Sequence, residues 1–343
     1  MSAHTCRWRA PMPSDGTALT PHPAGWDDDL RNALEDLQLD RWRSSQALLE
    51  RTIETARTWE LLTSRSQLLA AAAAKGHAVE AWRKEEPDDA YAAMMHARVL
   101  THRAVAAGRR GVDRYSVMAV TRHALVACDA AEERWPACPI PRICRLALAV
   151  LDIDPNRPVH RAHWAHPPEQ HLLPVGPWPL LLAVEELDPG NREAHHRMLQ
   201  CFKARGRGAL TFTKWATERA KPGSPLHVLP IYAYVDDYAA QFRKGTGSSI
   251  GYWNTEATHG YVQRARDGWF AWHQDPRRDC SILDLNYLAC GLINTGLPGA
   301  APVFEAIGPF AVAAPWEQTG PRSRWQHSFA IGHRFAMKEA SRR

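Results

Sequence analysis

A histidine-rich segment offers the most concentrated metal-binding chemistry in the chain. His160, His163, His166 and His171 occur there together with Glu169. Imidazole and carboxylate groups bind zinc or nickel when three or four of them converge on one point. A spacing of three residues in a proline-flanked segment does not fix that convergence. The segment is therefore interpreted as a solvated loop, with a metal site as the alternative, and the sequence assigns no metal ligand.

Other titratable residues stand next to one another in the sequence. Adjacent side chains of a helix point about 100° apart, so two such groups do not face each other. His195 and His196 are expected to diverge for this reason, with one of the two rings packed among apolar residues. The adjacent carboxylates are interpreted as solvated helix edges: Glu185 with Glu186, and Asp236 with Asp237.

The sequence also lacks the usual signs of a nucleophile or a nucleotide site. Cys201, Cys280 and Cys290 lie near apolar helical residues, and no paired base is identified for any of them. Neither G-x-x-x-x-G-K-S/T nor G-x-G-x-x-G occurs, and the fragment at residues 245–247 has no strand and helix around it. No catalytic residue and no cofactor-binding residue is therefore assigned.

Charge and hydropathy limit the classes of partner. The formal charge of +5 is spread along the chain, and the arginine pairs at residues 109–110, 277–278 and 342–343 are isolated from one another, which argues against nucleic acid. No apolar stretch reaches the roughly 18 residues that a membrane helix needs. The first 25 residues lack the apolar region of a signal peptide, and the 7 cysteines include no C-x-x-C pair. These features predict a cytoplasmic protein without a membrane segment.

The clearest structural element is a helical hairpin over residues 176–206. Apolar residues spaced by three and four predict a first helix, which Pro189 in Asp-Pro-Gly must end. Asn191 is expected to cap the second helix, and Gly206 to end it. Met198, Leu199 and Phe202 would form the buried side of that helix.

The same periodicity predicts helices along most of the chain and no strand. A proline-rich loop at residues 152–176 and a Gly/Ser linker at residues 245–251 would interrupt them. Trp42, Trp59 and Trp82 stand at predicted helix ends, where they are expected to pack between helices. The predicted helices cover residues 30–37, 42–55, 59–74, 94–108, 115–134, 143–151, 180–187, 192–205, 210–219, 226–242, 256–272, 284–294, 302–307 and 323–340.

The hairpin resembles the boundary between two tetratricopeptide repeats. The residues that carry this likeness are Leu187, Asp188, Pro189, Asn191, Ala194, Leu199, Phe202 and Gly206. Residues 285–307 show a second, partial likeness. The segments RSQLLA (65–70), EEPDDA (85–90), GPW (176–178) and DLNYLA (284–289) resemble a group of actinobacterial helical-repeat proteins of unknown function. The resemblance to tetratricopeptide repeats implies stacked helix pairs. The resemblance to the actinobacterial proteins implies no activity.

Together these observations predict an all-α protein made of stacked antiparallel helix pairs, a tetratricopeptide-like α-solenoid. Residues 1–23 would be a disordered leader, residues 24–245 a helical-repeat domain, and residues 246–343 further repeats that continue the solenoid. The predicted function is non-catalytic protein–protein interaction or scaffolding, with a peptide or partner helix bound on a concave helical surface. The alternative is an enzyme or metal-dependent protein with a site near the histidine-rich loop 160–171 and the central hairpin.

Overall fold

The structure, a computed structural model, describes residues 19–56, 58–152, 163–167, 173–243, 249–320 and 324–342. The chain divides into two compact units. One is Asp27–Ala220, here the 27–220 unit, and the other combines Met1–Trp26 with Lys221–Arg343, here the 221–343 unit. The described residues form helices and turns, together with one isolated β-bridge between Ala165 and Gly176. The all-α prediction is confirmed for this part of the chain.

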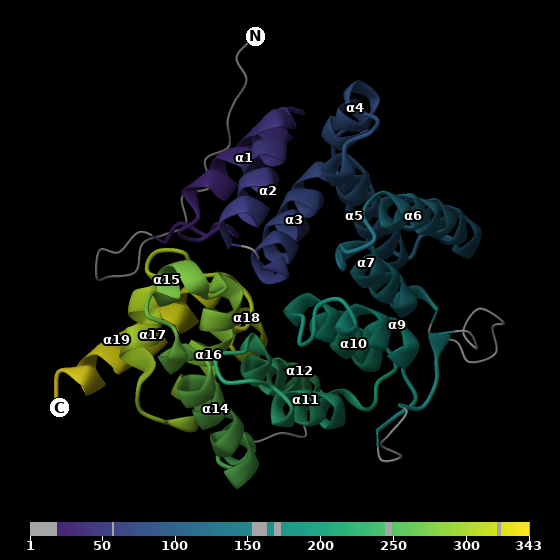
Figure 1. Ribbon diagram of the computed structural model, residues 1–343. Helices are drawn as coiled ribbons and strands as arrows, with labels where there is room; N and C mark the ends of the chain where they lie inside the picture. The colour runs from purple at the N-terminus through teal and green to yellow at the C-terminus, as the bar shows by residue number, and fades with distance from the viewer. Residues whose placement is uncertain are drawn as a thin grey trace. The chain divides into compact units, whose positions relative to one another are not determined.

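The helices of the 27–220 unit pack mainly against helices that are near to them in the sequence. The long helices α5 and α6 lie side by side as a pair, and α7 contacts both of them (Figure 1). The helices are α1 (Asp28–Gln38), α2 (Arg43–Ala56), α3 (Trp59–Ala73), α4 (Ala78–Glu85), α5 (Ala90–Arg109), α6 (Arg114–Arg134), α7 (Ile140–Leu148), η1 (Ala149–Leu151), α9 (Trp178–Glu185), α10 (Arg192–Ala204) and α11 (Ala209–Glu218).

Acidic and amide side chains begin several of these helices. The carboxylates of Asp27, Asp89 and Asp113 each accept a hydrogen bond from a backbone N–H in the first turn of the helix that follows. Such caps satisfy donors that have no partner within the helix, and each stabilises the helix by about 1 kcal/mol. The residue before each of these helices therefore helps to set where the helix begins.

Tryptophans fill the spaces between helix ends in this unit. The rings of Trp42 and Trp82 are stacked with centroids 5.3 Å apart, and both side chains are buried. Trp82 Nε1 also donates to the carboxylate of Asp89 at 2.8 Å, so its one polar atom is satisfied. Trp59 packs against Trp135, with ring centroids 5.5 Å apart. The interpretation of these tryptophans as packing residues is confirmed.

The 221–343 unit is built around α16, which contacts α12, α14, α17 and α19. Ten of its fourteen residues are buried, as expected for a helix surrounded by others. The elements of this unit are η2 (Pro225–Val228), α12 (Leu229–Arg243), α13 (Ser249–Trp253), α14 (Glu256–Gly268), η3 (Phe270–Trp272), α15 (Pro276–Asp279), α16 (Ile282–Thr295), α17 (Ala300–Ile307), α18 (Trp316–Thr319) and α19 (Trp325–Ala340).

Residues 19–26 pack within the same unit although they precede it by about two hundred residues. Trp26 Nε1 donates to the carbonyl oxygen of Ala306 at 2.7 Å, and the Trp26 ring lies edge-to-face against Phe310 at 4.9 Å. The backbone N–H of Thr20 donates to the carbonyl oxygen of Pro309 at 2.8 Å. Residues 1–18 of the predicted leader lie outside the described residues.

The structure differs from the predicted elements in a few places. The sequence pattern predicts no helix at α4, and Gly251, the last residue of the predicted Gly/Ser linker, lies inside α13. The helix predicted over residues 256–272 ends at Gly268 and is followed by η3. The predicted domain boundary at residues 245–246 lies outside the described residues and stays a prediction. In the described part of the chain, no helix combines the length and the apolar character that crossing a membrane requires.

Candidate functional site

The central hairpin forms as the sequence predicts. Asn191 Oδ1 accepts a hydrogen bond from the backbone N–H of Ala194 at 2.9 Å, and Asn191 Nδ2 donates to Asp188 at 2.7 Å. The carboxylate of Glu185 accepts from the backbone N–H of Gly190, which has a φ of 79°. This network fixes the turn between α9 and α10. It thereby sets which residues of α10 point into the core, among them Glu193.

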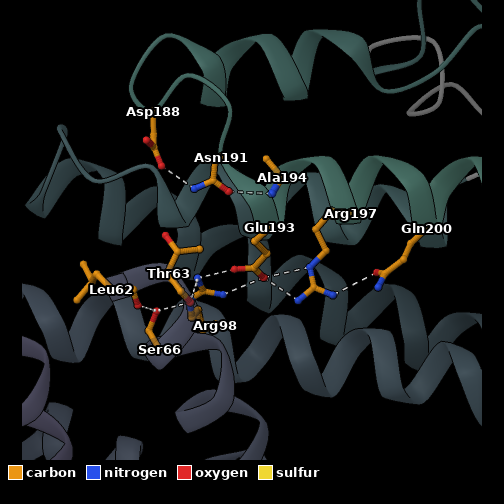
Figure 2. Close-up of polar contacts among 10 residues, drawn as sticks. All are labelled: Leu62, Thr63, Ser66, Arg98, Asp188, Asn191, Glu193, Ala194, Arg197 and Gln200. Atoms are coloured by element: carbon orange, nitrogen blue, oxygen red, sulfur yellow. Dashed lines mark hydrogen bonds and ion pairs between the residues drawn. The ribbon is translucent and has the colours of Figure 1, made fainter. Parts of the chain in front are cut away.

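Glu193 lies at the centre of a buried network of charged side chains (Figure 2). Arg98 of α5 approaches its carboxylate with both terminal nitrogens, at 2.7 and 3.1 Å. Arg197, one turn further along α10, donates to the same carboxylate from Nε and Nη2, at 3.1 and 2.7 Å. The side chains of Arg98 and Glu193 are only 3% and 4% exposed. The two arginines therefore hold one carboxylate between them away from solvent.

The network also joins a third helix. Arg98 Nη2 donates to the backbone carbonyl oxygen of Thr63 in α3 at 3.2 Å, and Arg197 Nη1 donates to the side-chain oxygen of Gln200 at 3.2 Å. Figure 2 shows Arg98 reaching between Thr63 on one side and Glu193 on the other. Helices α3, α5 and α10 are thus connected by side chains that are distant in the sequence.

The electrostatics hold this carboxylate in its ionised form. Burial by itself would raise the pKa of Glu193, but Arg98 and Arg197 outweigh that effect and lower the pKa to about 2. The nearby His102 has a pKa lowered to about 4, first by burial and then by the positive charges of Arg197 and Arg98. At neutral pH the site therefore holds two guanidinium groups, one carboxylate and a neutral imidazole.

This arrangement is suited to fixing helices rather than to proton transfer. A general acid or base works best when its pKa lies near the working pH, and neither Glu193 nor His102 meets that condition. Every hydrogen bond described for the Glu193 carboxylate comes from an arginine of the same chain. We interpret the network as a structural clamp that sets the register of α3, α5 and α10.

Sequence reasoning did not find this network. Arg98 and Glu193 are separated by 95 residues, and no local pattern pairs them. One signal was present, because Arg98 falls on the apolar side of α5 beside Met94 and Met95. A charged residue at such a position needs a partner, since an unpaired charge in a protein interior is very costly. That partner could not be named without the fold.

The two adjacent histidines of α10 diverge as expected. His195 is buried and stacks against Phe212 and Trp215, with ring centroids 6.0 and 6.5 Å apart, whereas His196 is half-buried. His195 Nδ1 lies 2.9 Å from the backbone carbonyl oxygen of Asn191, which accepts a hydrogen bond when that nitrogen carries the proton. Burial lowers the pKa of His195 to about 4. The prediction that one ring packs in the core is confirmed.

The neutral state of His195 leads to a pH-dependence prediction. The unfolded chain takes up a proton on this ring near pH 6.5, while the folded chain does so only near pH 4. We therefore expect the free energy of unfolding to fall as the pH falls between these values, by up to about 1.4 kcal/mol per pH unit for this ring. Urea denaturation across this range should show the dependence weakened in His195→Phe, because phenylalanine keeps the ring packing but cannot be protonated.

The matched control for that measurement is His123→Phe, since His123 is exposed on α6. A residual pH dependence should remain in His195→Phe, because burial also lowers the pKa of His96 and of His102 to about 4. If His195→Phe and His123→Phe changed the pH dependence equally, the claim that His195 is held neutral by burial would be wrong.

The histidine-rich segment is described only in part. His160, His171 and Glu169 lie outside the described residues. His163 is half-buried and His166 is exposed, on either side of Trp164, which is buried beneath the guanidinium group of Arg205. Within the residues that the structure covers, no three histidine, cysteine or carboxylate side chains lie close enough together to hold a metal ion. The metal alternative therefore stays a hypothesis.

The remaining candidates pack as ordinary side chains. Cys201, Cys280 and Cys290 are buried, and burial raises the pKa of Cys201 and of Cys290 to about 12, which keeps these two thiols protonated. Asp237 accepts hydrogen bonds from Tyr252 and Gln241. The burial of the three cysteines agrees with their position near apolar helical residues in the sequence.

The chain was also compared with models of known protein families, with curated proteins and with solved structures. None of the three comparisons gives a match.

Proposed function

We propose that this chain is a non-catalytic protein–protein interaction or scaffold protein of the cytoplasm that binds a peptide or partner helix on its helical surface. We further propose a tetratricopeptide-like solenoid with a concave face as its architecture. Support comes from the 27–220 unit, where α1 contacts α2 and α3, α5 contacts α6 and α7, and α10 contacts α9 and α11. Contacts between near neighbours are typical of stacked helix pairs.

The observation that carries the binding proposal is an exposed apolar and basic stripe on α19. Ile331 and Phe335 are 49% and 56% exposed, although they belong to a helix whose opposite face, including Phe329 and Ala336, is buried. Large apolar side chains that gather on one exposed face often mark an interaction site. We call this set of residues the α19 stripe. It consists of His327, Ile331, Arg334, Phe335 and Lys338, all of which are exposed.

The chemistry of the α19 stripe indicates the kind of partner. Its residues recur at intervals of three and four, so they share one face along about three turns of the helix. Ile331 and Phe335 provide an apolar centre, and Arg334 and Lys338 provide positive charge beside it. A partner helix with an apolar stripe flanked by acidic residues would match both properties. The apolar centre argues against nucleic acid, whose backbone presents phosphates.

We expect a photo-crosslinking amino acid placed at position 331 to capture one recurrent protein in host cells. A synthetic peptide from the acidic amphipathic helix of that protein should bind the purified chain, and fluorescence anisotropy would measure its affinity. Phe335→Asp and Lys338→Glu should each weaken binding at least tenfold, because one removes apolar burial and the other reverses a charge. Added salt should weaken the binding as well.

The control is Phe242→Asp, which changes another exposed phenylalanine of the same unit. Peptide affinity should be unaffected by this substitution. If the captured protein had no acidic amphipathic segment, or if Phe335→Asp left the affinity unchanged, the proposed site would be wrong. Binding of anionic lipid vesicles with the same dependence on Phe335 and Lys338 would instead identify the stripe as a membrane-surface contact.

A further inference from the structure

A second exposed apolar stripe lies on α6, in the 27–220 unit. Tyr115 is 85% exposed, Val126 is 65% exposed and Met118 is 44% exposed. These residues share one face of α6 with Arg122 and Glu133, because their spacings are three, four and seven residues. The opposite face is buried, with Ala124, Cys128 and Ala131 packed in the core. We call the exposed set, with Asp129 and Ala130 at its edge, the α6 stripe.

The charges of the α6 stripe are divided between its two ends. Arg122 lies in the half that also holds Tyr115 and Met118, and the preceding helix end adds the exposed Arg109 and Arg110. The other half ends in the exposed carboxylate of Glu133, whereas the carboxylate of Asp129 at its edge pairs with Arg145 of α7 in the same chain. The stripe therefore runs from a basic end to an acidic end, with apolar side chains between them.

Such a surface is complementary to itself when a second copy approaches in the opposite direction. In that orientation the basic half of each stripe faces the acidic half of the other, as a two-fold symmetric interface requires. A pairing centred on residue 126 would set Val126 opposite Val126 of the second copy and Arg122 opposite Ala130. Glu133 of the second copy would then lie about 4.5 Å further along the helix axis from the point opposite Arg122, within reach of its guanidinium group. A parallel pairing would instead place like charges together.

We propose that the α6 stripe is a homodimer interface in which α6 packs antiparallel against α6 of a second copy. Met118 and Val126 would lose their contact with water, and Arg122 would pair with Glu133 of the other chain. A dimer of this kind presents two α19 stripes, so it would bind two partner segments at once and gain avidity. The interface does not depend on the α19 stripe, because the two stripes belong to different units.

The test is sedimentation equilibrium of the full chain over a range of concentrations. We expect a reversible dimer for the native sequence and an increase of at least tenfold in the dimer dissociation constant for Arg122→Glu and for Glu133→Arg. Each variant alone would bring like charges together across the interface. An equimolar mixture of the two variants should dimerise as strongly as the native chain, because each mixed dimer restores an opposite charge at both contacts.

Lys84→Glu serves as the control, since it reverses an exposed charge on α4 away from the α6 stripe. It should leave dimerisation unchanged, and circular dichroism should show that all variants keep their helical content. A native chain that stays monomeric at about 100 µM, which implies an affinity too weak for a stable interface, would overturn the proposal. A mixture that dimerises no better than its components would overturn the antiparallel pairing on which the proposal rests.

Discussion

Truncating Phe202 to alanine is expected to lower the free energy of unfolding by about 3–5 kcal/mol, the range for removing a buried phenylalanine. Phe202 is fully buried, and its ring lies 5.3 Å from that of Phe212 and 6.1 Å from that of Trp178. A Cβ atom on Gly176 would approach the Phe202 ring to 2.7 Å, so the packing around it is tight. Since whole domains are stable by only about 5–15 kcal/mol, this loss would be a large part of the total.

The distribution of that loss tests the proposed solenoid. In a solenoid each repeat contacts only its neighbours, so the ends can lose structure separately. Hydrogen exchange of Phe202→Ala should therefore rise most in α9, α10 and α11, while α1 and α2 keep more of their protection. Phe242→Ala, at an exposed phenylalanine, should change stability by less than about 0.5 kcal/mol. Equal loss of protection throughout the 27–220 unit would mean one cooperative globule, and the solenoid would have to be abandoned.

Removing Arg98 from the buried network should lower the free energy of unfolding about as much as Phe202→Ala does. Arg98→Met leaves the Glu193 carboxylate buried with one of its two arginines missing, and breaking a buried ion pair in this way typically costs about 3–5 kcal/mol. The double variant Arg98→Met with Glu193→Met should lose less than the sum of the two single losses, since it removes both charges. Urea denaturation of the four proteins in this double-mutant cycle would measure the coupling.

The control for this cycle is Arg134→Met. Arg134 pairs with Asp88 at 2.8 Å, but both side chains are well exposed, so the loss should be at most about 1 kcal/mol. Equal losses of stability for Arg98→Met and Arg134→Met would contradict the clamp.

The stabilisation that the Arg98–Glu193 pair provides should also depend on pH in a defined direction. Because the pKa of Glu193 is lowered to about 2, its stabilising effect is present above about pH 4.5 and is lost as the pH falls toward 2.

Local sequence signals predicted the elements whose determinants are themselves local. The turn at Asp188–Asn191 is one example, because Pro189 ends a helix and the Asn191 side chain caps the next within three residues. Helix α4 was missed because it is only eight residues long, and its apolar residues Ala78, Val79 and Trp82 do not extend over two full turns. Short helices draw most of their stability from tertiary packing, which a local pattern does not reveal.

The candidate sites also differ in whether local sequence or tertiary packing determines them. The sequence predicts that one of the two adjacent histidine rings packs in the core, and the structure shows that it is His195, which stacks on Phe212. The clamp between Arg98 and Glu193 could not be predicted from the sequence, because it depends on how α5 and α10 meet in three dimensions. The α6 and α19 stripes also needed the structure. Periodicity shows that a helix has two faces, but burial decides which apolar residues, such as Tyr115 and Phe335, remain outside the core.

The contact between Trp26 and Ala306 has a consequence for the order of events during synthesis. The two residues are 280 positions apart, so residues 19–26 leave the ribosome long before their binding site has been made. The 27–220 unit is complete in sequence earlier, and domains commonly fold as they emerge. We therefore expect the 27–220 unit to fold first, while the Trp26 side chain stays exposed to solvent. Trp26 can contact Ala306 and Phe310 only after residues 306–310 have emerged. Formation of these contacts would therefore be a late step in the folding of the chain.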